Sequence, residues 1–270
     1  MSERGNPIHY EDLIPDWLRA APVRFVVTLL AVVTIYAFCF RYVDFELARL
    51  WSGLPRLVHW AAKAWPPDTH DLGILVQRGL ETVAMAVVGT TLGLLIAVPC
   101  CIFAARNLTP SLLLYVPMRW FLNVLRGIDS FIFALLFVAA VGLGPFAGVL
   151  GVGLHSAGTI AKLWSEAIEA VEPGPLEAAA LTGANRLKVI AYALLPDVMP
   201  SLASIALYVW EFNVRSSTVL GVVGAGGIGQ ELKNSVDLLD FARLFTIILI
   251  ILAMVTVIDQ ISALIRRRLL

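Results

Sequence analysis

The stretch that decides the fold reads Phe131-Ile-Phe-Ala-Leu-Leu-Phe-Val-Ala-Ala-Val-Gly-Leu-Gly-Pro-Phe-Ala-Gly-Val-Leu-Gly-Val-Gly-Leu-His-Ser-Ala-Gly-Thr-Ile-Ala161. It contains no Asp, Glu, Lys or Arg. A helix of about 20 apolar residues satisfies its own backbone across the roughly 30 Å hydrocarbon core of a bilayer. The stretch therefore predicts a membrane-spanning helix, and similar stretches are expected on either side of it.

Four further stretches have the length and composition of spans. They are Phe25–Phe40, Thr82–Ala105, Val198–Val223, which contains Glu211 and Arg215, and Leu244–Ile258. A sixth candidate, Ser111–Arg126, is rich in leucine but contains Pro117, Arg119 and Asn123, so it can cross only where neighbouring helices shield it from lipid. We therefore predict an all-α membrane protein with about six transmembrane helices.

The overall composition agrees with this interpretation. Hydrophobic residues make up 59% of the 270 residues and charged residues 15%, well below the charged fraction of about 25% in soluble chains. Twenty Lys and Arg balance twenty Asp and Glu, so no net field attracts nucleic acid, and we expect no nucleic-acid partner. Cys39, Cys100 and Cys101 all lie in apolar stretches and are interpreted as packing residues.

The spans divide the chain into segments. We predict a tail at 1–24, the first span at 25–40, a segment at 41–79, a core at 80–265 that contains a long loop at 162–197, and a basic tail at 266–270. Within 41–79, leucines and tryptophans recur at helical spacing, which favours an amphipathic helix at the membrane interface. A solvated loop is the alternative, because Pro55 interrupts the pattern.

The basic residues near the span ends predict the orientation. Arg266, Arg267 and Arg268 directly follow the last span, which places the C-terminus in the cytoplasm. Six spans then place the N-terminus and the 162–197 loop on the same side. The five Lys and Arg residues between Arg41 and Arg78 would lie outside, so the bias is weak.

The 162–197 loop has the local signals of two short helices separated by a break. Pro175 suits a first helical turn, Glu177 favours the positive end of a helix dipole, and Gly183 is typical of the position just after a helix. The second helix is expected over Ala184–Leu195, ending at Pro196. A helix of about eight residues is marginal in water and needs a partner surface.

The residues Glu177-Ala178-Ala179, then Gly183, then Leu195-Pro196 resemble the EAA loop of ABC-importer permeases. The resemblance implies that this loop is a coupling helix seated in a groove of a cytoplasmic ATPase subunit. Ala193 departs from the family pattern, which usually has isoleucine there. An Ala-rich hairpin with a purely structural role is the alternative. None of the lysines follows a glycine, so the chain lacks a phosphate-binding P-loop, and we expect ATP and Mg to bind the partner ATPase rather than this chain.

A second informative segment runs from Val214 to Glu231 and is rich in glycine. Gly224, Gly226 and Gly229 satisfy G-x-G-x-x-G, but the strands of a dinucleotide-binding fold are missing around them, which argues against a membrane-bound dehydrogenase. Because glycine adopts dihedral angles that other residues avoid, we interpret this segment as a tight periplasmic turn between the last two spans. Absorbance of bound dinucleotide in the purified chain would reveal the enzyme alternative.

The residues Arg-Ser-Ser-Thr-Val-Leu-Gly and Gly-Ala-Gly-Gly-Ile-Gly-Gln-Glu-Leu of this segment resemble the permeases of phosphonate, phosphite and hypophosphite importers. Together with the EAA loop, the resemblance covers the chain from about Thr82 to the C-terminus. The resemblance implies a type I importer fold in the bacterial inner membrane and a homodimer with its pathway on the two-fold axis. It also implies an ATPase dimer below and a periplasmic binding protein above. Asp129 replaces the proline of the family's Arg-x-Ile-Pro pattern.

Several polar residues are candidates for guiding a small phosphorus oxyanion, because ionisable groups at membrane depth usually face a cavity or a partner. We select Arg126, Asp129, Asn213, Arg215, Ser216, Ser217 and Thr218. Arginine offers forked donors for phosphoryl oxygens, and hydroxyl and amide groups add further contacts. Glu211 lies four residues before Arg215, so a structural ion pair is an equal alternative for Arg215. Gly224, Gly226, Gly227 and Gly229 are candidates for a gate or a binding-protein contact.

Other chemistry is not indicated. We find no catalytic constellation, and His155 has no second metal ligand nearby. Gly89-x-x-x-Gly93 and Gly144-x-x-x-Gly148 predict close helix packing within one subunit. An ion-coupled secondary transporter is the competing class, and it should show inverted repeats or paired interrupted helices, which we do not detect.

Overall fold

The computed structural model describes residues 21–109 and 111–269, and every regular element within those ranges is a helix. The chain forms two compact units, one up to His59 and one from Trp60 onward. The first unit contains α2 (Ala21–Tyr42) and most of α3 (Leu47–Lys63). The stretch Phe25–Tyr42 is apolar and long enough to span a membrane, as predicted, and none of it is buried against other parts of the chain. Cys39 is accordingly exposed, so its interpretation as a packing residue is wrong for the isolated chain.

The segment after the first span forms a helix rather than a loop. Helix α3 contains Pro55 and buries none of its residues, and its leucines and tryptophans gather on one face. The solvated-loop alternative is therefore wrong. The interfacial position of this helix stays a prediction.

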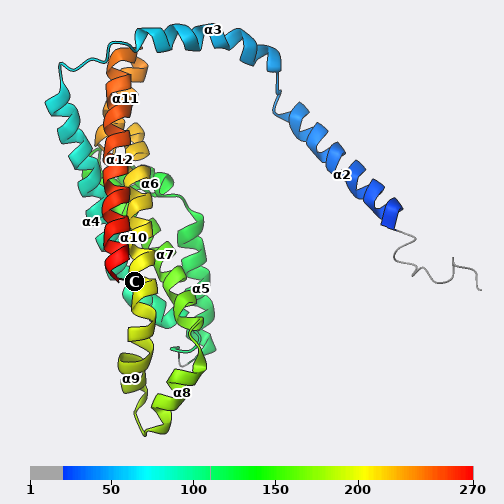
Figure 1. Cartoon of the computed structure of the whole chain (residues 1–270), viewed down its shortest axis with the longest axis vertical. Helices are drawn as coiled ribbons and strands as arrows, with labels where there is room; N and C mark the ends of the chain where they lie inside the picture. Colours follow the sequence, from blue (N-terminus) through cyan, green and yellow to red (C-terminus); the bar gives the residue numbers. More distant parts are fainter. Residues whose placement is uncertain (1–20, 110, 270) are drawn as a thin grey trace, which may run out of the picture. The chain divides into compact units, whose positions relative to one another are not determined.

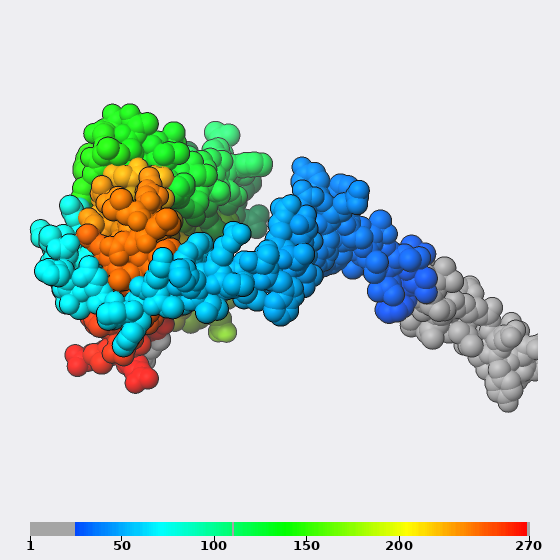
Figure 2. All heavy atoms as spheres, turned by 90° about the horizontal axis from the view of Figure 1, so that it is seen from above, coloured from blue at the N-terminus to red at the C-terminus, as the bar shows by residue number. Residues whose placement is uncertain are grey.

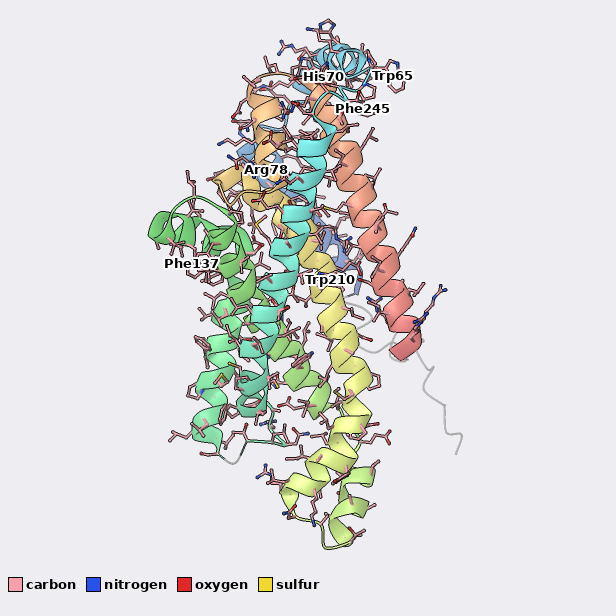
Figure 3. All side chains as sticks on the ribbon, turned by 90° about the vertical axis from the view of Figure 1, so that its left-hand side faces the viewer. Trp65, His70, Arg78, Phe137, Trp210 and Phe245 are labelled. Atoms are coloured by element: carbon pink, nitrogen blue, oxygen red, sulfur yellow. The ribbon has the colours of Figure 1, made fainter. Side chains whose placement is uncertain are left out.

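Five helices are long and apolar enough to cross a membrane, and a bent pair brings the number to as many as six within the described residues. In the second unit they are α4 (Leu72–Ala104), α7 (Pro145–Glu169), α10 (Leu195–Leu220) and α12 (Phe241–Leu269), and the bent pair is α5 (Leu112–Gly127) with α6 (Ser130–Val141). Figure 3 shows α4, α10 and α12 running along one another, with Trp210 on α10. Helix α4 begins eight residues before the predicted start of the core at 80.

The predicted span Phe131–Ala161 is not one helix. Helices α5 and α6 meet at an angle of 85°, and α6 ends at Gly142, after which α7 starts with Pro145 in its first turn. Gly142 and Gly144 have φ angles of 96° and 135°, which a helix cannot contain. Counting uncharged residues could not detect this turn, because none of its residues is polar. The fourth span is therefore α7, which continues past Ala161 to Glu169.

Close packing of α4 on α7 forms the centre of the second unit. A side-chain carbon added at Gly89 would lie 2.8 Å from Val152, and one at Gly93 would lie 2.6 Å from Ser156. This confirms the predicted packing role of Gly89-x-x-x-Gly93 within one subunit. In the second predicted motif only Gly148 packs closely, because a side-chain carbon there would lie 3.0 Å from Met85 of α4, whereas Gly144 lies outside the helix with nothing near it.

The two ends of the second unit differ in construction (Figure 1). One end carries α8 (Pro173–Leu181) and α9 (Arg186–Val189), which continues through a π-helical turn, η2 (Ile190–Leu194), into α10. The expected helix end at Pro196 is therefore wrong. The wider π turn, in which the Leu195 amide donates to the Ile190 carbonyl, lies just before Pro196, and the proline stands in the first turn of α10.

The other end carries η3 (Gly221–Val223) and α11 (Ile228–Asp237). The predicted tight turn between the last two spans is thus a turn, a helix of ten residues and a second turn at Leu239. Figure 2 shows α11, in orange, beside the start of α4, in cyan. Helix α12 then continues to Leu269, so the basic residues predicted as a separate tail are its last turns.

Candidate functional site

The segment that carries the EAA pattern is an uncovered surface. Helix α8 has no buried residue, and Glu177 and Ala178 are exposed while Ala179 is half-buried. Large apolar side chains are exposed beside them, with Leu181 at 89%, Leu187 at 75% and Tyr192 at 82%. Sequence reasoning missed these three residues, although apolar side chains in a charged loop are a detectable signal. Exposed apolar groups next to a short helix are typical of a docking surface.

Gly183 ends α8 as predicted. Its φ angle is 81°, and its amide donates to the Ala180 carbonyl at 3.0 Å. This left-handed conformation favours glycine and satisfies a carbonyl at the helix end. Leu195 and Pro196, also assigned to coupling, are exposed at the start of α10.

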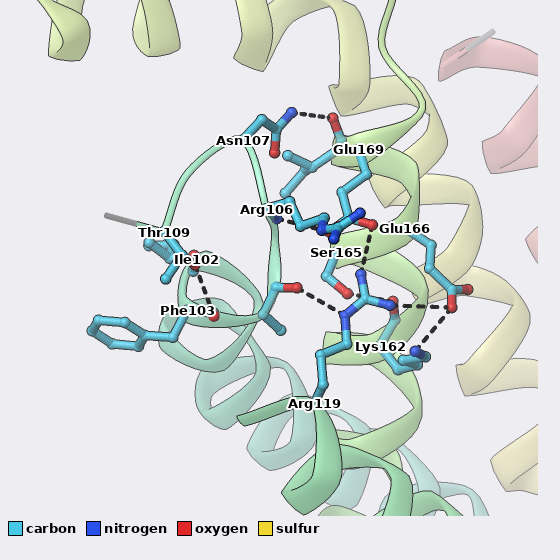
Figure 4. Close-up of polar contacts among 12 residues, drawn as sticks. Ile102, Phe103, Arg106, Asn107, Thr109, Arg119, Lys162, Ser165, Glu166 and Glu169 are labelled. Carbon is cyan, nitrogen blue, oxygen red and sulfur yellow. Dashed lines mark hydrogen bonds and ion pairs between the residues drawn. The ribbon is translucent and has the colours of Figure 1, made fainter. Parts of the chain in front are cut away.

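An ionic cluster joins this end of the bundle together (Figure 4). Arg119 of α5 pairs with Glu169 of α7 at 2.6 Å, and Lys162 pairs with Glu166 at 3.2 Å. The Arg119 side chain is 16% exposed, so pairing compensates the charge that made the 111–126 stretch doubtful as a span. The neighbouring loop is held by the same cluster, because Glu169 also accepts from the Arg106 amide at 2.7 Å.

The same loop contacts the segment from α8 to η2 (residues 173–194), which carries most of the EAA pattern and is here named the coupling segment. Arg186 of α9 donates to the carbonyls of Asn107 and Leu108 at 3.1 and 2.7 Å. Asn107 in turn donates to the Ile168 carbonyl at 2.7 Å. The α4–α5 loop therefore links the root of the coupling segment to α7.

The predicted pathway residues do not form one cluster. Asn213 is fully buried, and its amide donates to Thr90 on α4 at 2.8 Å and to Ser156 on α7 at 2.7 Å. Ser217 is also fully buried, without a partner for its hydroxyl. Both residues lie inside the subunit, and Asn213 joins α10 to α4 and α7.

The hydroxyls beside them are used within the chain. Ser216 shares a hydrogen bond of 2.7 Å with Ser130 of α6, and Thr218 donates to the Arg215 carbonyl at 2.7 Å. Arg215 is exposed and pairs with Glu211 at 2.9 Å, and Arg266 of α12 approaches the same carboxylate at 3.7 Å. The structural pair weighed against function at Arg215 is therefore present.

Arg126 and Asp129 flank the bend between α5 and α6. The Asp129 carboxylate caps α6 by accepting from the Phe131 amide at 2.8 Å. Arg126 is exposed and lines a cavity together with six residues of α7 and α10, namely His155, Thr159, Leu163, Tyr208, Val209 and Phe212. Of the selected pathway residues, Arg126 is the one that lines a cavity, and Thr159 is a lining residue that the sequence did not indicate.

The glycine-rich segment is mostly internal. Gly226, Gly227 and Gly229 are buried, while Gly224 keeps some exposed surface. A side-chain carbon at Gly229 would collide with the Thr218 carbonyl oxygen, and one at Gly221 with the Gln230 amide nitrogen. These glycines permit the end of α10 and the start of α11 to meet at backbone contact. Their roles as a gate or a binding-protein contact stay predictions.

Metal chemistry finds no support in the part of the chain that the structure describes, because no group of three or more His, Cys, Asp or Glu residues there could hold an ion. The structure thus presents an exposed apolar surface around α8 at one end, a tightly packed glycine end (residues 221–229), and a cavity with one arginine between them.

Comparison with known proteins identifies transport permeases as relatives of the chain. The putative phosphite transport system permease protein HtxC of Stutzerimonas stutzeri is 48% identical over 239 residues, which are 88% of this chain and 85% of the relative. The phosphate-import permease protein PhnE of Mycolicibacterium smegmatis is 42% identical over 205 residues, which are 76% of this chain and 38% of that protein.

Among solved structures, the inward-facing MetNI methionine ABC transporter contains a chain with the same fold. Its TM-score is 0.66 at 24% identity, covering 75% of this chain and 99% of that one. The family model described as the inner membrane component of binding-protein-dependent transport systems matches residues 89–270. The chain is therefore a multi-pass membrane protein that belongs to the family of inner membrane components of binding-protein-dependent transport systems.

Proposed function

We propose that this chain is the permease subunit of an ABC importer that moves a small phosphorus oxyanion, such as phosphonate, phosphite or hypophosphite, into the cytoplasm. The observation that carries the proposal is the 48% identity to a putative phosphite permease over 88% of the chain. The exposed, apolar-rich α8 segment supports the division of labour, since such a surface needs a partner.

The proposed partners follow from the family. A cytoplasmic ATPase dimer binds ATP and Mg and receives α8 and Gly183 in its grooves, while this chain holds no cofactor. A periplasmic binding protein delivers the anion at the glycine end, and a second copy of the chain completes the pathway. Both termini lie in the cytoplasm in this arrangement, in accord with Arg266, Arg267 and Arg268 at the end of α12.

The proposed mechanism is alternating access. Closure of the ATPase dimer displaces α8, and the contacts of Arg119, Glu169 and Arg186 pass the displacement to α5 and α7. The pathway binds its cargo weakly, because a conducting site must release what it accepts. Selectivity then resides chiefly in the binding protein.

Reconstitution tests this proposal. The chain is purified with its cognate ATPase and binding protein and inserted into lipid vesicles, and uptake of labelled phosphite or a phosphonate is measured with and without ATP. We expect uptake that requires ATP and the binding protein. Uptake by the chain alone, driven by an ion gradient, would instead establish the secondary transporter. Native mass spectrometry of the same complex distinguishes a homodimer from a pair with a different permease.

Inorganic phosphate is a second candidate cargo. The 42% identity to a permease named for phosphate import favours it, and the phosphoryl oxygens are chemically similar. Competition of unlabelled phosphate against labelled phosphite in the same vesicles separates the two. Preference for phosphate would assign the importer to that anion.

A further inference from the structure

A small cavity lies between α5, α7 and α10. Its volume is ≈ 350 Å³, near the lower end of the roughly 300–1,000 Å³ typical of ligand sites. His155 and Thr159 lie near the middle of α7, and Tyr208 lies near the middle of α10, so the cavity is far from both α8 and the glycine end. Tyr208 and Phe212 are exposed, which leaves the cavity open on one side of the subunit.

The cation of this cavity has no carboxylate partner among the described residues. Four arginines of the second unit pair with carboxylates: Arg78 with Glu81, Arg119 with Glu169, Arg215 with Glu211, and Arg243 with Glu231, whereas Arg186 donates only to carbonyls. Arg126 forms no such pair, and the nearest acidic residue in sequence, Asp129, caps α6. A guanidinium in an apolar cavity without a counter-ion can accept a passing anion in forked geometry.

A hydroxyl without a partner lines the same cavity. Thr82, Thr90, Thr91, Thr246 and Thr256 each donate to the carbonyl four residues earlier in their helix. The Thr159 hydroxyl is buried and has no hydrogen-bond partner. Because an unsatisfied buried hydroxyl is costly, an acceptor that reaches it would be stabilising; the Thr159 oxygen has almost no accessible surface, so a rotation of its side chain is needed to present it to the cavity.

The backbone of α5 contacts α7 at this cavity. A side-chain carbon at Gly158 would lie 2.9 Å from the Arg126 amide nitrogen, so the end of α5 rests directly on α7 beside Thr159. The His155 ring nitrogen Nδ1 lies 2.9 Å from the Ile128 carbonyl. Since a carbonyl only accepts, Nδ1 carries the proton and donates, and His155 secures the α5–α6 bend.

We infer that the Arg126 guanidinium and the Thr159 hydroxyl form a transit site for a tetrahedral phosphorus oxyanion in each subunit. The guanidinium donates to two phosphoryl oxygens, and the hydroxyl donates to one. The Arg126 guanidinium compensates only one negative charge of the anion, and the cavity is open on one side of the subunit. The site therefore binds the anion weakly, as transport requires. The inference rests on the proposed function and assigns a place within it.

The test uses the assembled importer in vesicles. Arg126→Gln removes the charge, Arg126→Lys keeps the charge without the fork, and Thr159→Val keeps the shape without the hydroxyl. We expect uptake of labelled phosphite to fall about tenfold for Arg126→Gln, and less for the other two. ATP hydrolysis stimulated by the binding protein should persist, which shows that the variants fold and assemble.

Two matched controls lie outside the cavity. Arg49→Gln removes an arginine that is paired with Glu46, and Thr91→Val removes a hydroxyl that donates to Val87. Both should retain uptake within about twofold. If Arg126→Gln fails to assemble, Arg126→Lys and Thr159→Val decide, and wild-type uptake in both would overturn the site.

The phosphate of a lipid headgroup could occupy the same site as a free oxyanion. Vesicles of galactolipids, which contain no phosphate, distinguish these two occupants. With a free oxyanion in the site, wild-type uptake in these vesicles stays above that of Arg126→Gln. A fall of wild-type uptake to the variant level would assign the residue to a lipid headgroup and overturn the inference. Absence of uptake by the wild-type importer in any vesicle would instead contradict the proposed function.

Discussion

The glycine end of the bundle, at η3 and α11, and the end that carries α8 and α9, here called the coupling end, both contain small residues of a family pattern. These small residues are buried at the first end and exposed at the second. At the glycine end, Gly226, Gly227 and Gly229 are buried against the chain's own helices. At the coupling end, Glu177, Ala178 and Gly183 are exposed, and α8 buries none of its residues. The first end is built to complete the subunit, while the second end leaves its surface open for a partner.

The largest effect expected from this comparison is at Gly229. A side chain at this position collides with the Thr218 carbonyl, so Gly229→Ala should lower the free energy of unfolding by more than about 3 kcal/mol. Yield and thermal unfolding in detergent measure it. Gly73→Ala is the control, because nothing lies near its side-chain position. Equal stability of the two variants would contradict the backbone contact.

At the coupling end, Gly183→Pro should leave the fold of the helix bundle intact but reduce the uptake that is coupled to ATP hydrolysis. Proline cannot adopt a φ of 81°, and it removes the amide that donates to Ala180. We expect phosphite uptake per ATP hydrolysed to fall about tenfold, equivalent to about 1.4 kcal/mol of coupling. Gly53→Ala, a change into open space outside α8, should couple normally. Tight coupling in Gly183→Pro would argue against docking at this turn.

Asn213 distinguishes an internal role from a pathway role. Its amide joins α4 and α7, so Asn213→Ala should cost about 1–2 kcal/mol of stability without changing the preference among anions. Asn123→Ala, an exposed position on α5, should be neutral. Thermal unfolding and anion competition report the two properties separately. A changed anion preference at full stability would return Asn213 to the pathway.

The smallest effect is expected at Arg215. Its guanidinium is 47% exposed and its partner Glu211 also has Arg266 nearby. Arg215→Gln should therefore cost at most about 1 kcal/mol in unfolding experiments and leave uptake nearly normal. A loss of uptake as large as that for Arg126→Gln would show that the arginine serves the cargo rather than the carboxylate.

The sequence predicted about six spans and a short helix ending before Gly183 because both depend on local composition. Charge-free length identified α4 and α12, the apolar stretch around Glu211 and Arg215 identified α10, and Gly183 marked the end of α8. The division of 131–161 was missed because its turn, Gly142 to Gly144, is as apolar as the helices beside it. The sequence did not predict that the helix continues through Pro196. The π turn before it provides room for the proline, and no residue preference indicates such a turn.

The candidate pathway was predicted less well, because residue type does not reveal which way a helix faces. Asn213 and Arg215 are two residues apart on α10, yet one is buried at a helix junction and the other is exposed beside Glu211. Thr159 drew no attention in the sequence, since only tertiary packing shows that its hydroxyl lacks a partner. Arg126, chosen for its charge at membrane depth, does line a cavity.

The ionic cluster around Arg119 has a mechanical consequence. Glu169 holds both the Arg119 side chain and the Arg106 amide, and Arg186 clasps the carbonyls of Asn107 and Leu108. Four segments that are distant in sequence thereby behave as one stiff block. We therefore expect a displacement of α8 to move α5 and α7 together with it, instead of being absorbed by the α4–α5 loop.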